Sequence, residues 1–179
     1  KCGLRLQLPL ASRSPRVLKQ AYVTYIRPVL EYASSVWSPH LIKHIDAIER
    51  VQKKFTKRIH ALSDLSYPER LAALDIEPLE LRRLKADLTL YYKSINNLVA
   101  LPFNQYFNVS HHFSQTRSGG DRLIQPQCRT NYFENDFFNR CIACWNNLPS
   151  NVISANSVSS FKRLLSSVDL SSYLHCSYF

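Results

Sequence analysis

Two cysteines separated by two residues are the sharpest chemical feature of the chain. Cys141 and Cys144 form a C-x-x-C pair, and Cys128, His175 or Cys176 could complete a set of four zinc ligands. Zinc knuckles usually enclose such a pair in a glycine-bearing turn, whereas this pair lies in an apolar stripe with helical spacing. A redox pair would need a strand-helix-strand context, which is missing. We therefore expect two small buried hydrophobic residues, and we assign no metal site and no cofactor.

Other side chains capable of catalysis are scattered along the chain. His111 and His112 lie in a polar stretch without a nearby carboxylate or cysteine, so we interpret them as solvated loop residues. The aspartates are isolated from one another, which leaves no Asp-Asp pair to hold two catalytic metal ions. No G-x-S-x-G, H-E-x-x-H or phosphate-binding glycine loop occurs. We assign no catalytic residue and expect that the chain alone is not an enzyme.

Clustered cations give the strongest functional signal. Five of them fall between residues 50 and 58, with Glu49 as the nearest acid, and three more lie near residue 83. Such a row suits phosphate groups, which attract positive charge whatever the base sequence. A solvated outer helix face is the alternative interpretation. The predicted nucleic-acid-binding residues are Arg50, Lys53, Lys54, Lys57, Arg58, Arg82, Arg83 and Lys85.

Aromatic residues precede this basic run. Tyr22, Tyr25, Tyr32 and Trp37 could stack on bases, but aromatic residues at helical spacing are more often part of a core. We therefore interpret "LEYASSVWSPH" as a core helix with its exit turn, and the basic helix that follows as the segment that meets a partner. Trp37 and Trp145 are both predicted to be buried beside proline-terminated helix ends.

The composition supports a basic, helical, globular protein. The 179 residues include 23 Lys and Arg against 13 Asp and Glu, a formal net charge of +10, which favours a polyanionic partner. With only 3 Gly against 9 Pro, a sheet of tight glycine hairpins is disfavoured. Five cysteines without a secreted framework favour a reducing, intracellular compartment. No apolar run approaches the ~20 residues of a membrane span. Because residue 1 is Lys and Met is absent, we expect a part of a longer protein.

Hydrophobic periodicity predicts an all-α fold, a bundle of about five to six helices. A loop-rich segment at 102–130, with a short β element at 122–124, should divide a basic helical domain, 1–100, from a C-terminal segment, 101–179, whose two helices pack on it. The predicted helices cover 15–37 with a kink near Thr24 caused by Pro28, then 42–62, 66–74, 78–98, 132–148 and 158–168. The expected inward rows are Leu18, Tyr22, Tyr25, Val29, Tyr32 and Val36 in the first helix and Ile45, Ile48, Val51, Phe55, Ile59 and Leu62 in the second.

The order of these segments resembles the C-terminal region of the reverse transcriptase encoded by jockey-like non-long-terminal-repeat retrotransposons. The resemblance covers about residues 17 to 165, and the ordered set is more specific than any one piece. The matching stretches are "YIRPVLEYASSVWSP", "HIDAIERVQKKFTKRI", "LSYPERLAALDIEPLELRRLKADLTLYYKSINN", "RTNYFENDFFNRCIACWNNLPSNV" and "SFKRLL".

The resemblance implies a helical thumb and post-thumb segment that grips an RNA template and the growing RNA/DNA duplex. It further implies that the palm and fingers of the same polyprotein precede this segment and hold the polymerase Asp-Asp pair, which is missing here. The expected setting is a nuclear or cytoplasmic ribonucleoprotein, without a membrane partner. A non-enzymatic helical module that binds an acidic protein through its basic face is the alternative.

Overall fold

A computed structural model describes residues 14–101, 109–110 and 122–176 of the chain. The fold is all-α, as predicted, and its strands are two residues long. The N-terminal elements are α1 (Pro15–Ala21), the π-helix η1 (Tyr22–Ile26), α2 (Arg27–Glu31), α3 (Ser34–Trp37), α4 (Ile42–Lys57), the 3₁₀ turn η2 (His60–Leu62), α5 (Tyr67–Leu74) and α6 (Leu79–Ile95). They are followed by β1 (Val109–Ser110), β2 (Arg122–Leu123), α8 (Asn131–Glu134), α9 (Phe137–Arg140), α10 (Ile142–Asn146), α11 (Ser150–Ile153), α12 (Val158–Leu165) and the 3₁₀ turn η3 (Ser171–Tyr173).

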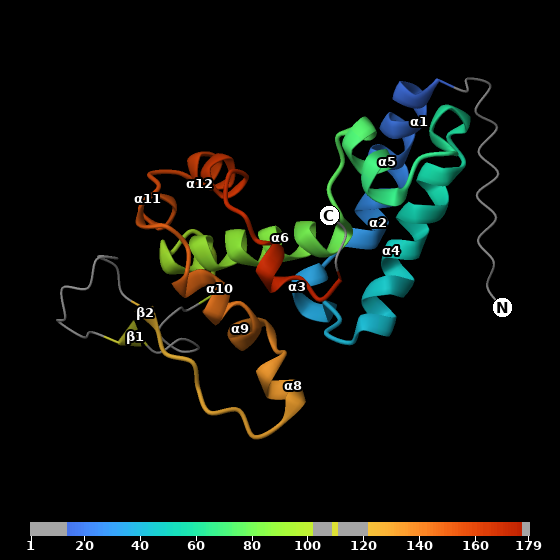
Figure 1. Ribbon diagram of the computed structural model, residues 1–179. Helices are drawn as coiled ribbons and strands as arrows, with labels where there is room; N and C mark the ends of the chain where they lie inside the picture. Colours follow the sequence, from blue (N-terminus) through green and yellow to red (C-terminus); the bar gives the residue numbers. More distant parts are fainter. Residues whose placement is uncertain (1–13, 102–108, 111–121, 177–179) are drawn as a thin grey trace.

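Helix α6 connects the two ends of the fold. In Figure 1 its N-terminal end lies beside α2, α4 and α5, and its C-terminal half runs beneath α11 and α12. The main apolar core surrounds this second half, where Leu88, Tyr91 and Tyr92 pack with Trp145 and Phe161. Elements from both sides of residue 101 in the sequence therefore pack against the same helix, α6. None of the helices in the described ranges combines the length and apolarity needed to cross a bilayer.

The short β element is present and is anchored to α10. Strand β2 pairs antiparallel with β1, with Val109 opposite Leu123. The Asn146 side chain accepts a hydrogen bond from the Leu123 backbone N–H (2.9 Å) and donates one to the Leu123 carbonyl (2.8 Å). This side chain therefore satisfies the backbone groups of Leu123 that the strand pairing leaves open.

The predicted first helix, 15–37, is interrupted twice. Its irregularity near Thr24 takes the form of the π-helix η1, in which the Arg27 N–H bonds to the Tyr22 carbonyl ahead of Pro28. A second break, which the sequence pattern did not predict, follows α2 because Ala33 adopts the left-handed conformation (φ 51°). The Trp37 indole donates a 2.6 Å hydrogen bond to the Tyr32 carbonyl, which has left the helical ladder there.

The expected inward row of this helix was wrong beyond its first turns. Tyr22 is buried, but Tyr25, Val29, Tyr32 and Val36 are 66%, 75%, 80% and 86% exposed. The two breaks rotate the later residues away from α4 and α6, so an apolar pattern with correct spacing faces outward. We call these four exposed residues the apolar strip. Trp37, which was predicted to be buried, is 40% exposed.

Helix α4 is shorter than the predicted helix 42–62, and the side that it buries is rotated about the helix axis relative to the predicted inward row. It ends at Lys57, because Ile59 takes an extended conformation that buries its side chain. The buried stripe is Ile45, Glu49, Gln52 and Thr56, whereas Val51 of the predicted row is 40% exposed. Polar residues occupy the buried side because each of them finds a hydrogen-bond partner there.

The C-terminal stripe is buried as predicted but is not one helix. Phe137, Cys141, Trp145 and Leu148 are buried, yet residues 131–146 form α8, α9 and α10. Side-chain caps begin two of these helices. Thr130 accepts a hydrogen bond from the Phe133 N–H at the start of α8, and Asp136 accepts one from the Phe138 N–H at the start of α9. Elsewhere Ser66 and Glu69 form a capping box at the start of α5, and α12 buries Phe161 and Leu165. The predicted helix 78–98 is shorter in the structure, because α6 ends at Ile95 and Leu98 beyond it is 56% exposed.

We expect the two tryptophans to differ in their contribution to stability. Trp145 is 2% exposed and lies among Tyr91 and Phe161, so Trp145→Ala should lower the free energy of unfolding by ~3 to 5 kcal/mol. Trp37→Ala removes a half-exposed indole and one hydrogen bond, for which we expect a decrease of ~1 to 2 kcal/mol. Urea unfolding of both variants measures the difference. Equal decreases would contradict the assignment of Trp145 to the core.

Candidate nucleic-acid interface

The solvent side of α4 carries cations along its whole length. Lys43, Arg50, Lys54 and Lys57 are all exposed, and their spacing places them within one narrow arc of the helix. We call these four residues the α4 cationic face. From Lys43 to Lys57 it extends ~21 Å at 1.5 Å per residue. Arg58, at the C-terminal cap of the helix, is exposed beside it. This face could meet several successive phosphates of a nucleic-acid strand.

Asp46 neutralises part of the predicted site. Its carboxylate lies 3.0 Å from Lys53 Nζ and 3.4 Å from an Arg50 guanidinium nitrogen. The hydrogen bond from Lys53, followed by the charge of that lysine, lowers the pKa of Asp46. Lys53 also lies 5.4 Å from the centroid of the Tyr67 ring. Within the described part of the chain, in contrast, no carboxylate lies within ion-pair distance of Lys43, Lys54, Lys57 or Arg58.

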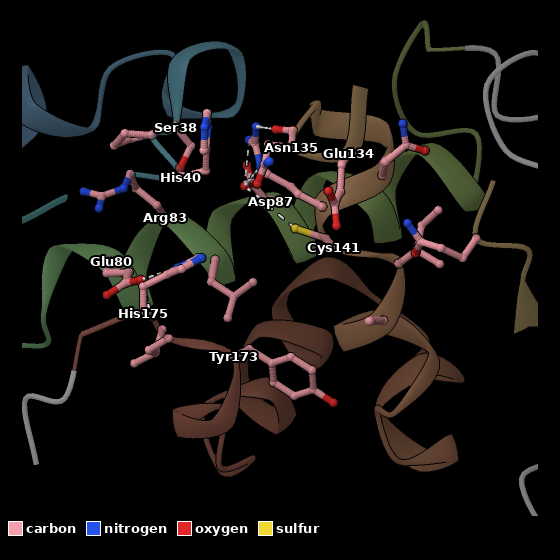
Figure 2. A pocket seen from close by; sticks show the side chains of 18 of the residues that line it. Ser38, His40, Glu80, Arg83, Asp87, Glu134, Asn135, Cys141, Tyr173 and His175 are labelled. Carbon is pink, nitrogen blue, oxygen red and sulfur yellow. Dashed lines mark hydrogen bonds and ion pairs between the residues drawn. The ribbon is translucent and has the colours of Figure 1, made fainter. Parts of the chain in front are cut away.

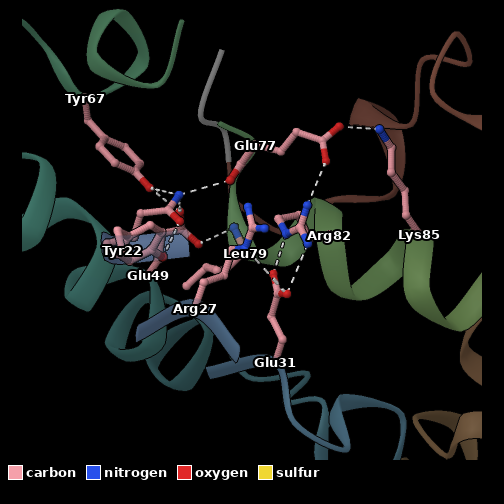
Figure 3. A network of polar contacts seen from close by, with 10 residues as sticks. Tyr22, Arg27, Glu31, Glu49, Tyr67, Glu77, Leu79, Arg82 and Lys85 are labelled. Carbon is pink, nitrogen blue, oxygen red and sulfur yellow. Dashed lines mark hydrogen bonds and ion pairs between the residues drawn. The ribbon is translucent and has the colours of Figure 1, made fainter. Parts of the chain in front are cut away.

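The three predicted cations of α6 do not join this face, because two are held by carboxylates and the third is buried. Arg82 forms a two-pronged ion pair with Glu31 of α2, and Glu77 lies 3.7 Å from the same guanidinium (Figure 3). Lys85 also pairs with Glu77. Arg83 is only 2% exposed, so in this conformation it cannot reach a phosphate on the surface. The structure therefore does not bring the two predicted basic clusters together on one face.

A buried polar cluster on the opposite side of α4 holds the cationic face in place. Figure 3 shows the cluster, in which Gln52 receives a 2.5 Å hydrogen bond from the Tyr22 hydroxyl and donates to Tyr67 and to the Glu77 carbonyl at 3.0 Å. Glu49 accepts a hydrogen bond from the Tyr67 hydroxyl and a 2.9 Å bond from the Leu79 backbone N–H. We call Tyr22, Glu49, Gln52 and Tyr67 the polar seam. It ties α4 to η1, α5 and the start of α6.

Burial determines the protonation behaviour of the polar seam. Removal of Glu49 from water raises the pKa of its carboxyl, and this effect outweighs the opposing hydrogen bonds from Tyr67 and Leu79. Burial, and then the nearby carboxylate of Glu49, also raise the pKa values of Tyr22 and Tyr67, so both hydroxyls remain donors. The sequence analysis missed this cluster. A signal was present, because Glu49, Gln52 and Thr56 recur at helical spacing beside the apolar row.

The cysteine pair is buried, as predicted. Cys141 and Cys144 are 1% and 2% exposed, and burial raises the pKa of Cys144 to about 12. Burial also raises the pKa of Cys141, assisted by the negative charge of Asp87. Protonated thiols are poor nucleophiles and poor metal ligands. Among residues 14–101, 109–110 and 122–176, no three His, Cys, Asp or Glu side chains are grouped to hold a metal ion. His111 and His112 lie outside the described residues.

A polar cleft of about 630 Å³ lies between α6, α8 to α10 and the C-terminal segment (Figure 2). Two pairs of charged or titratable groups meet across elements there: Arg140 binds the buried Asp87 carboxylate (2.8 and 3.0 Å) and the Ser35 carbonyl (2.8 Å), and Glu80 lies 3.0 Å from His175. These interactions join segments up to 105 residues apart, which no local pattern could have indicated. Both signs of charge line the cleft, with the carboxylates Glu80, Asp87 and Glu134 beside the guanidinium groups of Arg83 and Arg140, so it forms no cationic surface like that of α4.

The aspartates within the described ranges take part in separate local interactions. Of the isolated aspartates, Asp46 and Asp87 form ion pairs within the fold, and Asp136 and Asp169 accept backbone hydrogen bonds at turns and helix ends. Asp121 lies outside the described ranges.

No protein-family model, no curated protein and no solved structure matches the chain.

We expect the polar seam to make stability depend on pH through Glu49. Its pKa is raised in the folded state above the ordinary value of 4.5. Between that value and the folded-state pKa, the folded protein binds more protons than the unfolded protein, so it becomes less stable as pH rises. Glu49→Gln removes this dependence. The free energy of unfolding of the wild-type chain relative to Glu49→Gln should therefore fall between pH 4 and pH 7 in urea titrations.

An exposed carboxylate supplies the control for this measurement. Glu134 is exposed and forms no ion pair with any described residue, so Glu134→Gln removes a carboxylate of the same chemistry without touching the polar seam. Parallel pH profiles for wild type and Glu49→Gln would show that burial of Glu49 does not set its pKa.

Proposed function

We propose that this chain is a non-catalytic module that grips nucleic acid, and that it serves as the thumb-like C-terminal part of a retrotransposon reverse transcriptase. Its partners would be the RNA template and the RNA/DNA duplex, together with the palm and fingers of the same polyprotein. A nuclear or cytoplasmic ribonucleoprotein is the proposed setting. The resemblance of the ordered sequence segments supports the polymerase context.

The α4 cationic face is the observation that carries the proposal. It is exposed, it follows one helix for ~21 Å, and Lys43, Lys54 and Lys57 lack carboxylate partners among the described residues. Cations held by a rigid helix attract phosphates of any sequence, which suits a protein that moves along a template. The polar seam supplies the rigidity, since it fixes the opposite side of the same helix to three other elements.

A second candidate function follows from the apolar strip. Tyr25, Val29, Tyr32 and Val36 are each at least 66% exposed, and exposed apolar side chains in a row are typical of surfaces that another protein covers. This observation favours a helical protein-interaction module. Binding to an acidic protein through the α4 cationic face, with no affinity for duplexes, would select this function over the first.

Removal of two cations from α4 should weaken nucleic-acid binding without affecting sequence preference. In Lys54→Gln/Lys57→Gln, we expect lower affinity for RNA/DNA duplexes of unrelated sequence. On duplex DNA the salt dependence, log K against log salt, should flatten by ~0.9 for each phosphate group that the variant no longer neutralises. Fluorescence anisotropy at several salt concentrations measures both quantities.

The matched control removes the same charge elsewhere. Arg129→Gln/Arg163→Gln replaces two exposed cations, one between β2 and α8 and one on α12, neither of which forms an ion pair with a described residue. The control should retain the wild-type salt slope. An α4 variant that also retains it would contradict the proposed interface.

We expect no primer extension by the purified chain, even when Mg²⁺, primer-template and nucleotides are supplied. Phosphoryl transfer needs carboxylates that hold metal ions bridging the attacking and leaving oxygens, and Asp46 and Asp87 are each held by an arginine or lysine instead. Extension that is free of contaminating polymerase, and that is abolished by mutation of any of the aspartates, would overturn the non-catalytic assignment.

A further inference from the structure

A second cationic surface lies between α6 and α12 and shares no residue with the α4 cationic face. A cleft of about 450 Å³ opens there, between the middle of α6 and the last turn of α12. Four cations and one carboxylate line it, together with two hydroxyls and two apolar side chains. The cations are Arg82, Lys85, Lys93 and Lys162, and the carboxylate is Glu77. We call this site the α6–α12 cleft.

The positive charge of the cleft is only partly compensated. Glu77 holds Lys85 and lies 3.7 Å from Arg82, whose main partner is Glu31 (Figure 3). Lys93 and Lys162 form no ion pair with any residue in the described ranges. They approach the cleft from different helices, 69 positions apart in the chain. Both ammonium groups are therefore available to an anion in the cleft.

The two helices that form the cleft are packed against each other through the main core. Leu165, 1% exposed, belongs to that core, and the Thr89 hydroxyl donates a 2.7 Å hydrogen bond to the Lys85 carbonyl within α6. Tyr92 of α6 stacks on Phe161 of α12 with ring centroids 4.4 Å apart, which joins the two helices directly. The backbone positions that carry the cations are therefore set before an anion binds, which lowers the ordering cost of binding.

We propose that the α6–α12 cleft binds a phosphate group, with Lys93 and Lys162 as its principal ligands and Lys85 as a supporting charge. Lysine binds phosphate as a compact point charge, so two lysines on facing helices can hold one phosphate without a preformed fork. The phosphate could belong to a nucleic-acid backbone or to a small polyphosphate. Binding of a nucleic-acid backbone rests on the proposed function, whereas binding of a small polyphosphate does not.

The test compares Lys93→Gln/Lys162→Gln with the control Arg129→Gln/Arg163→Gln. Arg163 follows Lys162 in sequence but does not line the cleft, so the two variants differ in position and not in charge. Each protein is titrated with inorganic pyrophosphate while its backbone amide NMR signals are followed. We expect shifts concentrated at residues 85–93 and 162–166 in wild type and control, and at least a tenfold weaker response in the cleft variant.

A second titration with an RNA/DNA duplex distinguishes the source of the phosphate. A flatter salt dependence in the cleft variant than in the control identifies backbone phosphates as a ligand, whereas pyrophosphate binding alone identifies a small polyphosphate. Pyrophosphate shifts outside the cleft, or equal responses of the two variants to both ligands, would overturn the proposal. A failure of the cleft proposal would not decide the proposed function, because the test of that function replaces only Lys54 and Lys57.

Discussion

The buried carboxylate of Glu49 is the interaction on which the arrangement of the N-terminal helices depends. One of its oxygens accepts the Tyr67 hydroxyl, and the other accepts the Leu79 N–H at the first turn of α6. A negative charge at a helix N-terminus is favourable, because the free N–H groups and the helix dipole both point toward it. Glu49 therefore determines where α6 starts relative to α4, and through α6 it connects α4 to the main core.

The same constraint explains which cations remain exposed. Since α4 turns its polar stripe inward, Lys54 and Lys57 on its opposite side face solvent, while Lys53 lies at the edge and is held by Asp46. On α6, carboxylates from the elements next to it hold Arg82 and Lys85. Cations that appear equivalent in the sequence thus differ in availability, according to which acids the fold places near them. The cations without a carboxylate partner are the principal ligands in both proposals of phosphate binding.

The apolar strip and the α4 cationic face suggest different kinds of partner. Charged side chains on a rigid helix suit a polyanion, while Tyr25, Val29, Tyr32 and Val36 suit an apolar protein surface. Under the proposed function both surfaces are needed, because a thumb-like module must contact nucleic acid and also the rest of its polymerase. The two surfaces can be mutated separately, since their residues lie on α4 and on η1 to α3.

The sequence by itself determined the helical class, the basic character, the short helix that follows Ser66, the burial of Trp145 and the cysteine pair, and the outward position of Lys54 and Lys57. These properties depend on local spacing and residue type, which periodicity records directly. Tertiary structure alone decided that Ala33 breaks the first helix, that α4 buries Glu49 and Gln52 in place of Val51, and that Arg83 is inaccessible. The burial of Gln52, for example, depends on Tyr67 and Tyr22, which lie 15 and 30 residues away in the chain. A polar residue is stable in a core only where such a partner stands opposite it. Helical spacing within α4 marks the polar stripe, but it cannot show the partners that other elements supply.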